Sequence, residues 1–226
     1  MKLGLFGGTF NPIHRCHLTV ARQVRERLGL DSILFIPTGT PPHKPLGSLA
    51  PADHRLAMAR EAVADEPGFA VSDIEVRRTT TSYSIDTVRA LQQERGPATE
   101  LYFIIGLDAF LEIHTWKQAP DLLRSCHFVV IGRPGSAFGR LMTLSLLPPL
   151  SPELLRAIDT GLKEDAEVPL PSNRTLFLLS LQPCPISASA IRDRLRRGLP
   201  CDDWLPVRVH SYIMRFGLYK EASDRA

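Results

Sequence analysis

Short apolar runs alternate along the chain with segments whose apolar residues recur at helical spacing. Residues 3–6 form the first run, and the segment behind it places Leu18, Ala21 and Val24 on one helical face. Further apolar runs predict strands at 32–37, 69–76, 100–106, 127–132 and 175–179. Helical spacing predicts helices within 51–65, 84–91, 109–113, 151–161, 188–199 and 205–217. This alternation predicts an α/β fold, a doubly wound and mainly parallel sheet with helices on both faces.

Several helix boundaries carry their own signals. Ser84 is the expected N-cap of the helix that follows it, and Ser151 is expected to cap the helix that opens at Pro152. Gly217 is expected to end the C-terminal helix, because glycine adopts the left-handed conformation there without a side-chain clash.

The 226 residues carry a net charge of only +3. A dedicated nucleic-acid binder usually shows a strong basic stripe, so this balance argues against that class and allows a local basic pocket. Arg55 and Arg60, on the helix predicted at 51–65, are interpreted as solvated side chains. No apolar run approaches transmembrane length, and no signal peptide precedes the first strand. We therefore expect a cytoplasmic protein that acts on neither nucleic acid nor a membrane.

The four cysteines are widely scattered and form no C-x-x-C pair: Cys16, Cys126, Cys184 and Cys201. We expect them to be reduced thiols, as is usual in a cytosolic protein. Cys16 stands between two histidines, but no second Cys/His pair follows at the spacing of zinc ligands. The sequence therefore does not predict a zinc site.

The stretch 2–18 combines a strand, a glycine-bearing loop and a helix start. Gly7 and Gly8 let backbone amides approach an anion, and the helix dipole favours negative charge there. His14 and His17 lie near the first turn on roughly one face. Neither G-x-G-x-x-G nor a P-loop G-K-[ST] is present, so the stretch predicts a phosphate site of another type. A tight turn with solvated histidines is the alternative.

Three further polar side chains follow predicted strands. Lys44 lies in a Pro-rich loop after the second strand, Asp108 follows the fourth and Arg133 the fifth. Lysine and arginine suit phosphate, and a carboxylate accepts hydrogen bonds from ribose hydroxyls. Ligands bind at the carboxyl ends of parallel strands, so these groups are expected to meet in one cleft. A rigid surface loop around Lys44 and a helix cap at Asp108 are the alternatives.

Residues 7–17 read G-G-T-F-N-P-I-H-R-C-H, which resembles the G-G-[ST]-F-D-P-x-H-x-G-H signature of the nucleotidyltransferase superfamily. The longer pattern resembles bacterial nicotinate-nucleotide adenylyltransferases. Matching segments are P-P-H-K at 41–44, S-Y-S at 82–84, G-L-D at 106–108, I-S-A-S-A-I-R at 186–192 and the closing L-P-V-R-V-H-S-Y-I at 205–213. The resemblance covers nearly the whole chain apart from roughly 136–174, and it implies a Rossmann-like fold.

The resemblance implies transfer of the adenylyl group of ATP to nicotinate mononucleotide, giving deamido-NAD and pyrophosphate in NAD biosynthesis. The catalytic residues that it implies are His14, His17, Lys44 and Arg192. The implied ATP-binding residues are Gly7, Gly8, Thr9, Phe10, His14, His17, Gly106, Asp108, Ser187, Ile191 and Arg192. The residues implied for nicotinate mononucleotide are Lys44, Tyr83, Ser84, Asp108, Trp116 and Arg133. Mg²⁺ would be held mainly by the ATP phosphates, and no residue is predicted to be a metal ligand.

Two residues depart from the family signature. Asn11 stands where the family usually has Asp, and we expect it to affect the shape of the loop more than the chemistry. Cys16 stands where the family has Gly, and its side chain is expected to weaken ATP affinity without abolishing function.

Other functions stay open. One is another nucleotidyltransferase, acting on nicotinamide mononucleotide, on pantetheine phosphate or with CTP; the P-P-H-K loop and Trp116 disfavour the last two. A non-catalytic nucleotide-binding protein is the more distant alternative, and Asn11 and Cys16 are its support. The preference between nicotinate and nicotinamide is not readable from the sequence.

The domain organisation is interpreted as a single nucleotidyltransferase domain over 1–226. It includes an insertion near 136–174 that varies within the family and a C-terminal helical part at 188–219. Residues 136–149 could serve as a lid or as an oligomer contact, and a homo-oligomer stays open.

Overall fold

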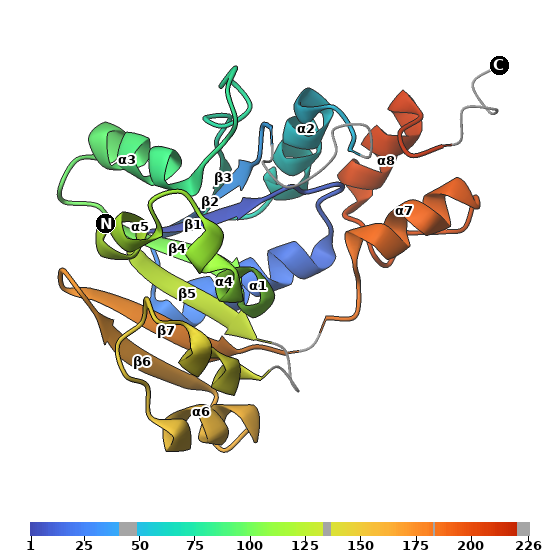
Figure 1. Cartoon of the computed structure of the whole chain (residues 1–226). Coiled ribbons are helices and arrows are strands. Elements are labelled where there is room, and N and C mark those ends of the chain that lie inside the picture. The colour runs from blue at the N-terminus through green and yellow to red at the C-terminus, as the bar shows by residue number, and fades with distance from the viewer. Residues whose placement is uncertain (41–48, 133–136, 183, 221–226) are drawn as a thin grey trace. The chain divides into compact units, whose positions relative to one another are not determined.

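The computed structural model describes residues 1–40, 49–132, 137–182 and 184–220 (Figure 1). The strands are β1 (Lys2–Gly8), β2 (Ser32–Pro37), β3 (Phe69–Val71), β4 (Glu100–Gly106), β5 (His127–Gly132), β6 (Asp165–Leu170) and β7 (Arg174–Ser180). The α-helices are α1 (Arg15–Leu28), α2 (Ala52–Val63), α3 (Ser84–Arg95), α4 (Leu107–Leu111), α5 (Ala119–Ser125), α6 (Pro152–Asp159), α7 (Ala188–Arg196) and α8 (Val207–Phe216). Two 3₁₀ helices are η2 (Ile113–Thr115) and η3 (Phe138–Thr143).

The strands form a seven-stranded sheet in the order β3-β2-β1-β4-β5-β7-β6. The pairs β2–β3, β1–β4, β4–β5 and β5–β7 are parallel, whereas β6 runs antiparallel to β7. The predicted α/β fold with a mainly parallel sheet is therefore confirmed. No helix in the described part of the chain has the length and apolarity needed to cross a membrane.

The chain divides into two compact units, and each is described by itself. The first unit comprises Met1–Phe6, Val24–Asp31 and Tyr83–Pro183. The second comprises Gly7–Gln23, Ser32–Ser82 and Cys184–Ala226. The interpretation as a single domain over 1–226 stays a prediction.

The first unit is built on β4 and β5, whose residues are almost all buried. Nearly continuous apolar strands are typical of a parallel sheet with both faces covered. Phe103 of β4 lies opposite Phe128 of β5 in the register, and their rings pack 5.5 Å apart. Phe110 of α4 packs on Phe128 at 5.6 Å. The aromatic stack packs α4 against the middle of β4 and the beginning of β5.

The second unit is built on the pair β2–β3 and on helix α2, which packs on both strands. Helix α8 packs on the same helix, as Figure 1 shows. The guanidinium of Arg208 on α8 donates to the carboxylate of Asp65, just past the end of α2, at 3.0 and 3.3 Å. The C-terminal helix is therefore part of the unit that holds the loop after β1.

The predicted helix ends at Ser151 and Gly217 are confirmed. The Ser151 hydroxyl accepts a hydrogen bond from the Leu154 amide at 3.1 Å. Gly217 ends α8 with φ at 58°, in the left-handed region. Ser84 is not an N-cap as predicted: α3 begins at Ser84, and no side chain caps it.

Two strands differ from the predictions. The strand expected at 69–76 ends at Val71, because the chain turns at Ser72, whose hydroxyl accepts from the Ile74 amide at 3.3 Å. Strand β6 was not predicted, although its residues alternate between exposed and buried. Its Pro169 hid the pattern, since proline within a run argues against a central strand. The structure places β6 at the end of the strand order, where proline is tolerated.

The expectation of four reduced thiols is wrong for two cysteines. Cys16 and Cys184 form a disulfide with their Cα atoms 5.7 Å apart, whereas Cys126 and Cys201 are free. The two bonded residues are 168 positions apart, so only the tertiary fold brings them together. Spacing along the chain carries no signal for such a pair.

Gly39, in the loop after β2, has no room for a side chain. A Cβ there would overlap the carbonyl oxygen of Glu75, whereas a Cβ at Gly106 would meet no atom within 4 Å. We expect Gly39→Ala to lower the free energy of unfolding by about 1–3 kcal/mol, because overpacked backbone must shift. Gly106→Ala is the matched control and should leave the urea midpoint nearly unchanged. Equal midpoints for the two variants would contradict this account.

Candidate functional site

The loop between β1 and α1 is a compact turn built around Phe10. This residue is buried and has φ at 46°, in the left-handed region. Its ring meets the His17 ring edge-on at 5.0 Å and lies 5.9 Å from the ring of Phe35 on β2. A Cβ at Gly8 would press on the Phe10 ring at 3.0 Å. Gly8 therefore lets the aromatic ring pack against the end of the strand.

The two histidines are held together by reciprocal hydrogen bonds. The His14 amide donates to Nδ1 of His17 at 3.1 Å, and the His17 amide donates to the His14 carbonyl at 2.9 Å. The ring centroids lie 3.8 Å apart. Because Nδ1 of His17 accepts a hydrogen bond, the proton of the neutral ring must reside on Nε2. His17 is thereby fixed as an Nε2–H donor.

The charge of His17 is set by its surroundings. Burial, and to a lesser extent the neighbouring His14, hold the pKa of His17 well below its usual value of 6.5. The ring is therefore neutral near pH 7 and acts by hydrogen bonding rather than by net charge.

Asn11 is a hub of this unit. Its Oδ1 accepts from the Ala50 amide at 3.0 Å and from the Tyr219 hydroxyl at 2.8 Å. Its backbone carbonyl accepts from Nη1 of Arg192, on α7, at 2.8 Å. An amide oxygen suffices as acceptor for both donors. These contacts hold the loop, and the expected effect of Asn in place of Asp stays a prediction.

Helix α7 begins beside this hub. Ser187 caps it by accepting from the Ala190 amide at 3.2 Å, and Ile191 is fully buried. Arg192 is half-buried, and its guanidinium has five N–H donors, so the bond to Asn11 leaves donors for a phosphate. The predicted ATP residues of α7 are thus brought to the same loop as the histidines.

Arg55 is not solvated as predicted but buried, with 2% of its surface exposed. From α2 its guanidinium donates to four backbone carbonyls, those of Thr9 at 2.8 Å, Thr38 at 2.6 Å, Gly39 at 3.0 Å and Ala50 at 3.0 Å. One side chain therefore fixes the loop after β1 and both ends of the segment after β2. Burial lowers the pKa of Arg55 from its usual value.

The first unit holds the remaining described candidates. Gly106 ends β4, and the space beside its Cα is open, so the fold does not require glycine there. Asp108 is exposed in the first turn of α4. It is not the N-cap of that helix, because Gly106 occupies the cap position.

Tyr83, Ser84 and Trp116 form a second group in the first unit. Nζ of Lys117 lies 4.7 Å from the centroid of the Tyr83 ring and 3.0 Å from a carboxylate oxygen of Asp86. These contacts bring the turn that carries Trp116 to the start of α3. Trp116 is half-buried and meets the Phe103 ring edge-on at 6.2 Å.

Lys44 and Arg133 lie outside the described residues. Their predicted phosphate contacts stay predictions, as does the convergence of all the candidate residues on one cleft.

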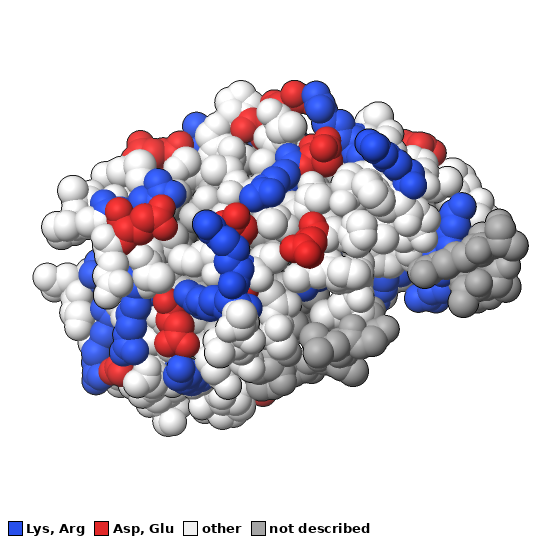
Figure 2. All heavy atoms as spheres, turned by 90° about the horizontal axis from the view of Figure 1, so that it is seen from above, with Lys and Arg blue, Asp and Glu red and all other residues white. Residues whose placement is uncertain are grey.

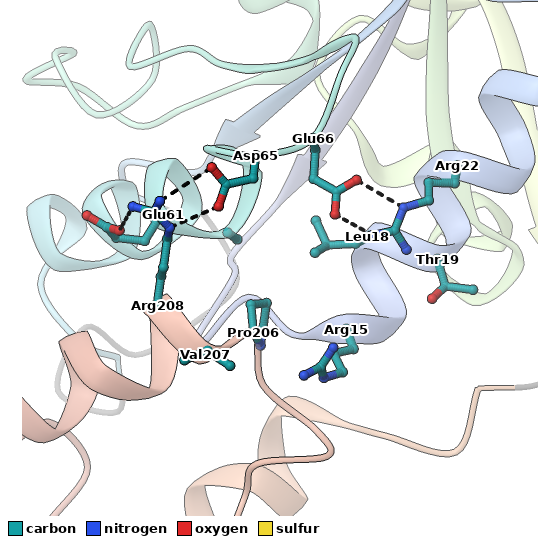
Figure 3. Close-up of a pocket in the computed structure, with 11 residues that line it drawn as sticks. Arg15, Leu18, Thr19, Arg22, Glu61, Asp65, Glu66, Pro206, Val207 and Arg208 are labelled. Carbon is teal, nitrogen blue, oxygen red and sulfur yellow. Dashed lines mark hydrogen bonds and ion pairs between the residues drawn. The ribbon is translucent and has the colours of Figure 1, made fainter.

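Figure 3 shows a pocket of about 280 Å³ in the second unit, lined by α1, α2 and the start of α8. Two ion pairs line it: Arg22 binds the Glu66 carboxylate, and Arg208 binds Asp65. Of the described residues that line it, none is a predicted site residue. On the face drawn in Figure 2, Lys and Arg lie among Asp and Glu. Within the described ranges, no cluster of three or more His, Cys, Asp or Glu side chains could hold a metal ion.

The strand that ends in Gly7-Gly8, the tight loop with His14 and the helix that begins with His17 in its first turn are features of a nucleotide-binding α/β protein. The model of the cytidylyltransferase-like family matches residues 5–194. A probable nicotinate-nucleotide adenylyltransferase of Pelobacter propionicus is 51% identical over 98% of this chain and 99% of its own length. One of Geobacter metallireducens is 40% identical over 97% and 98%. The chain belongs to the cytidylyltransferase-like family, among relatives named probable nicotinate-nucleotide adenylyltransferases.

Solved structures agree on the fold. A nicotinic acid mononucleotide adenylyltransferase of Plasmodium falciparum, complexed with NaAD, superposes with a TM-score of 0.69 at 18% identity. The match covers 96% of this chain and 97% of that one. The predicted Rossmann-like nucleotidyltransferase fold is confirmed.

Arg55 and Lys117 were missed as structural supports of the site. A signal for Arg55 was present: it shares a helical face with the apolar residues Met58, Ala59 and Ala62. A polar residue on the apolar face of a helix is a candidate for burial with partners.

A substitution of Arg55 tests whether its four hydrogen bonds stabilise the loops after β1 and β2. Arg55→Met leaves four carbonyls without their donor, so we expect a loss of at least about 3 kcal/mol in the free energy of unfolding. Arg60→Met on the same helix removes one exposed ion pair with Asp73 and should cost less than about 1 kcal/mol. Urea unfolding at neutral pH measures both. Similar losses in the two variants would show that the four bonds do not support the fold.

The lowered pKa of His17 predicts a pH effect on stability. As the pH falls below about 6.5, the unfolded chain binds a proton on this residue that the folded chain excludes, so stability is lost. His17→Asn keeps a side-chain acceptor and removes the titrating ring. Its urea midpoint should therefore fall less steeply between about pH 7 and pH 5 than that of the unsubstituted chain. Parallel curves would rule out the assigned environment of His17.

Proposed function

We propose that this chain transfers the adenylyl group of ATP to nicotinate mononucleotide, giving deamido-NAD and pyrophosphate, in NAD biosynthesis. The observation that carries the proposal is the full-length identity, up to 51%, to relatives with that name. The fixed Nε2–H donor of His17 in the first turn of α1 supports it, because transfer between phosphates needs a hydrogen-bond donor to the phosphate oxygens.

The reaction needs no protein nucleophile. The phosphate of nicotinate mononucleotide attacks the α-phosphorus of ATP in line, and pyrophosphate leaves. Since the nucleophile is already an anion, catalysis depends on positioning and on stabilising charge that develops on the transferring group. The neutral His17 ring, held in place by a hydrogen bond from the backbone, is suited to this role because its Nε2–H need not reorient during the reaction.

The residues then divide by substrate. His14, His17 and Arg192 bind the ATP phosphates, with Lys44 assisting, while Gly7, Gly8, Thr9 and Phe10 shape the loop around them. The helix start at Ser187 and the buried Ile191 support that end of ATP, and Gly106 and Asp108 contact its adenosine part. Tyr83, Ser84 and Trp116 bind the pyridine end, and Arg133 binds the phosphate of nicotinate mononucleotide. The aromatic face of Trp116 suits stacking on a flat ring.

Mg²⁺ is proposed as the cofactor. It would be carried by phosphate oxygens and water. When bound, it neutralises charge on the triphosphate. We also propose a cytoplasmic location, because both substrates are multiply charged and do not cross a bilayer.

The experiment that tests the proposal uses His17→Asn. It keeps the acceptor for the His14 amide but removes the Nε2–H donor, so kcat should fall at least about 100-fold. Release of pyrophosphate from ATP and nicotinate mononucleotide measures it, and far-ultraviolet circular dichroism checks the fold. Unchanged turnover in a folded variant would exclude His17 from the reaction.

The acceptor is tested separately. Turnover with nicotinate mononucleotide should exceed that with nicotinamide mononucleotide, and pantetheine phosphate should give no pyrophosphate. Faster turnover with the nicotinamide compound would reassign the acceptor while keeping adenylyl transfer.

A further inference from the structure

The disulfide between Cys16 and Cys184 joins two elements that the proposed function places at the ATP phosphates. Cys16 lies in the first turn of α1, between His14 and His17. Cys184 lies three residues before Ser187, the N-cap of α7. Both cysteines belong to the same compact unit. The bond therefore ties the histidine helix to the segment that leads to Arg192.

The other two cysteines are poorly placed to compete for this chemistry. Cys126 is fully buried, and Cys201 is 1% exposed. Burial raises the pKa of the Cys126 thiol to about 12 and raises that of Cys201 above its usual range. A protonated thiol is a weak nucleophile. Cys184 is half-buried whereas Cys16 is buried, so a reagent from solvent reaches the bond through Cys184.

We propose that Cys16 and Cys184 form a reversible thiol–disulfide site, opened by dithiols and closed by small disulfides, whose closed form binds ATP more tightly. The inference rests on the proposed adenylyl transfer for its effect on ATP, but not for the site itself. Disulfides in cytosolic proteins are usually transient and redox-sensing, so a bond at this place is expected to be reversible.

The exchange balances in two steps. A thiolate of the dithiol attacks Sγ of Cys184, forming a mixed disulfide and releasing the Cys16 thiolate. The second thiol of the reagent then attacks its own bonded sulfur, releasing the Cys184 thiolate and leaving the reagent as a cyclic disulfide. The protein gains two electrons and two protons, and the dithiol loses both. A small disulfide such as oxidised glutathione reverses the change through a mixed disulfide with Cys184, which the Cys16 thiolate resolves.

The effect on ATP follows from the remaining contacts. When the disulfide is reduced, the hydrogen bond from Arg192 to the Asn11 carbonyl still links α7 to the loop after β1. The start of α7 then has more conformational entropy, and more of it is lost when ATP binds. Preorganisation strengthens binding by removing such ordering costs. We expect ATP affinity to fall about threefold to tenfold on reduction, with a smaller change in kcat.

The first experiment tests the site without any assay of activity. The full chain is equilibrated either with dithiothreitol or with oxidised glutathione, and free thiols are counted after denaturation under acid. We expect all four of its cysteines to react in the first sample and two in the second. Peptide mapping should place the crosslink at Cys16 and Cys184. Four reactive thiols after oxidation, or a crosslink elsewhere, would overturn the proposal.

The second experiment tests the effect on ATP. Calorimetry measures the Kd of ATP for both redox states, and pyrophosphate release measures the KM. Cys184→Ser, which lies outside the proposed catalytic set, should bind ATP like the reduced chain under both conditions, and Cys126→Ser should stay as redox-sensitive as the unsubstituted chain. Equal ATP affinity in two states that thiol counting proves distinct would overturn the effect on ATP.

The thiol–disulfide site and the proposed adenylyl transfer can be rejected independently of each other. A redox-dependent Kd without pyrophosphate release would sustain the thiol–disulfide site and reject adenylyl transfer. Pyrophosphate release with the same KM for ATP in both redox states would sustain adenylyl transfer and reject the effect of the disulfide on ATP.

Discussion

The loop that leads from β1 to the histidine pair depends on one buried cation, Arg55. The guanidinium of Arg55 is planar and rigid, and its donors diverge from a single centre, so it can join carbonyls that belong to separate segments. Here it joins the loop after β1, the end of β2 and the entry to α2. Without it, the carbonyl oxygens of this turn would need water molecules as hydrogen-bond donors. The arginine replaces that water with a fixed scaffold, on which the histidine pair is built.

The histidine pair shows how backbone geometry sets chemistry. An imidazole near neutral pH has two tautomers and a charged form, which differ in what they offer a phosphate. The hydrogen bond from the His14 amide and the low-polarity surroundings together select one of these forms. The aromatic contact with Phe10 fixes the ring plane as well. A phosphate bound here, as proposed, would therefore meet a donor whose position and proton are both determined in advance.

The sequence predicted the parts of the fold that local patterns determine. Continuous apolar runs gave β4 and β5, and capping chemistry gave the start of α6 and the end of α8. Local patterns could not give the partners of Arg55 or Cys16, because those partners are brought near by the tertiary fold. The candidate motif residues come from a resemblance, and His14, His17 and Arg192 lie in one unit, where Arg192 binds the Asn11 carbonyl. The tautomer of His17 depends on a backbone direction that no sequence pattern encodes.

Strand β6 has a consequence for association between copies of the chain. It stands at the end of the strand order, so one of its sides is an open sheet edge. Pro169 removes an amide donor from the strand, and the exposed carboxylates of Asp165 and Glu167 repel an identical edge. A sheet with such a border resists continuous growth by strand addition. The border therefore protects the exposed edge against the intermolecular pairing that leads to aggregation.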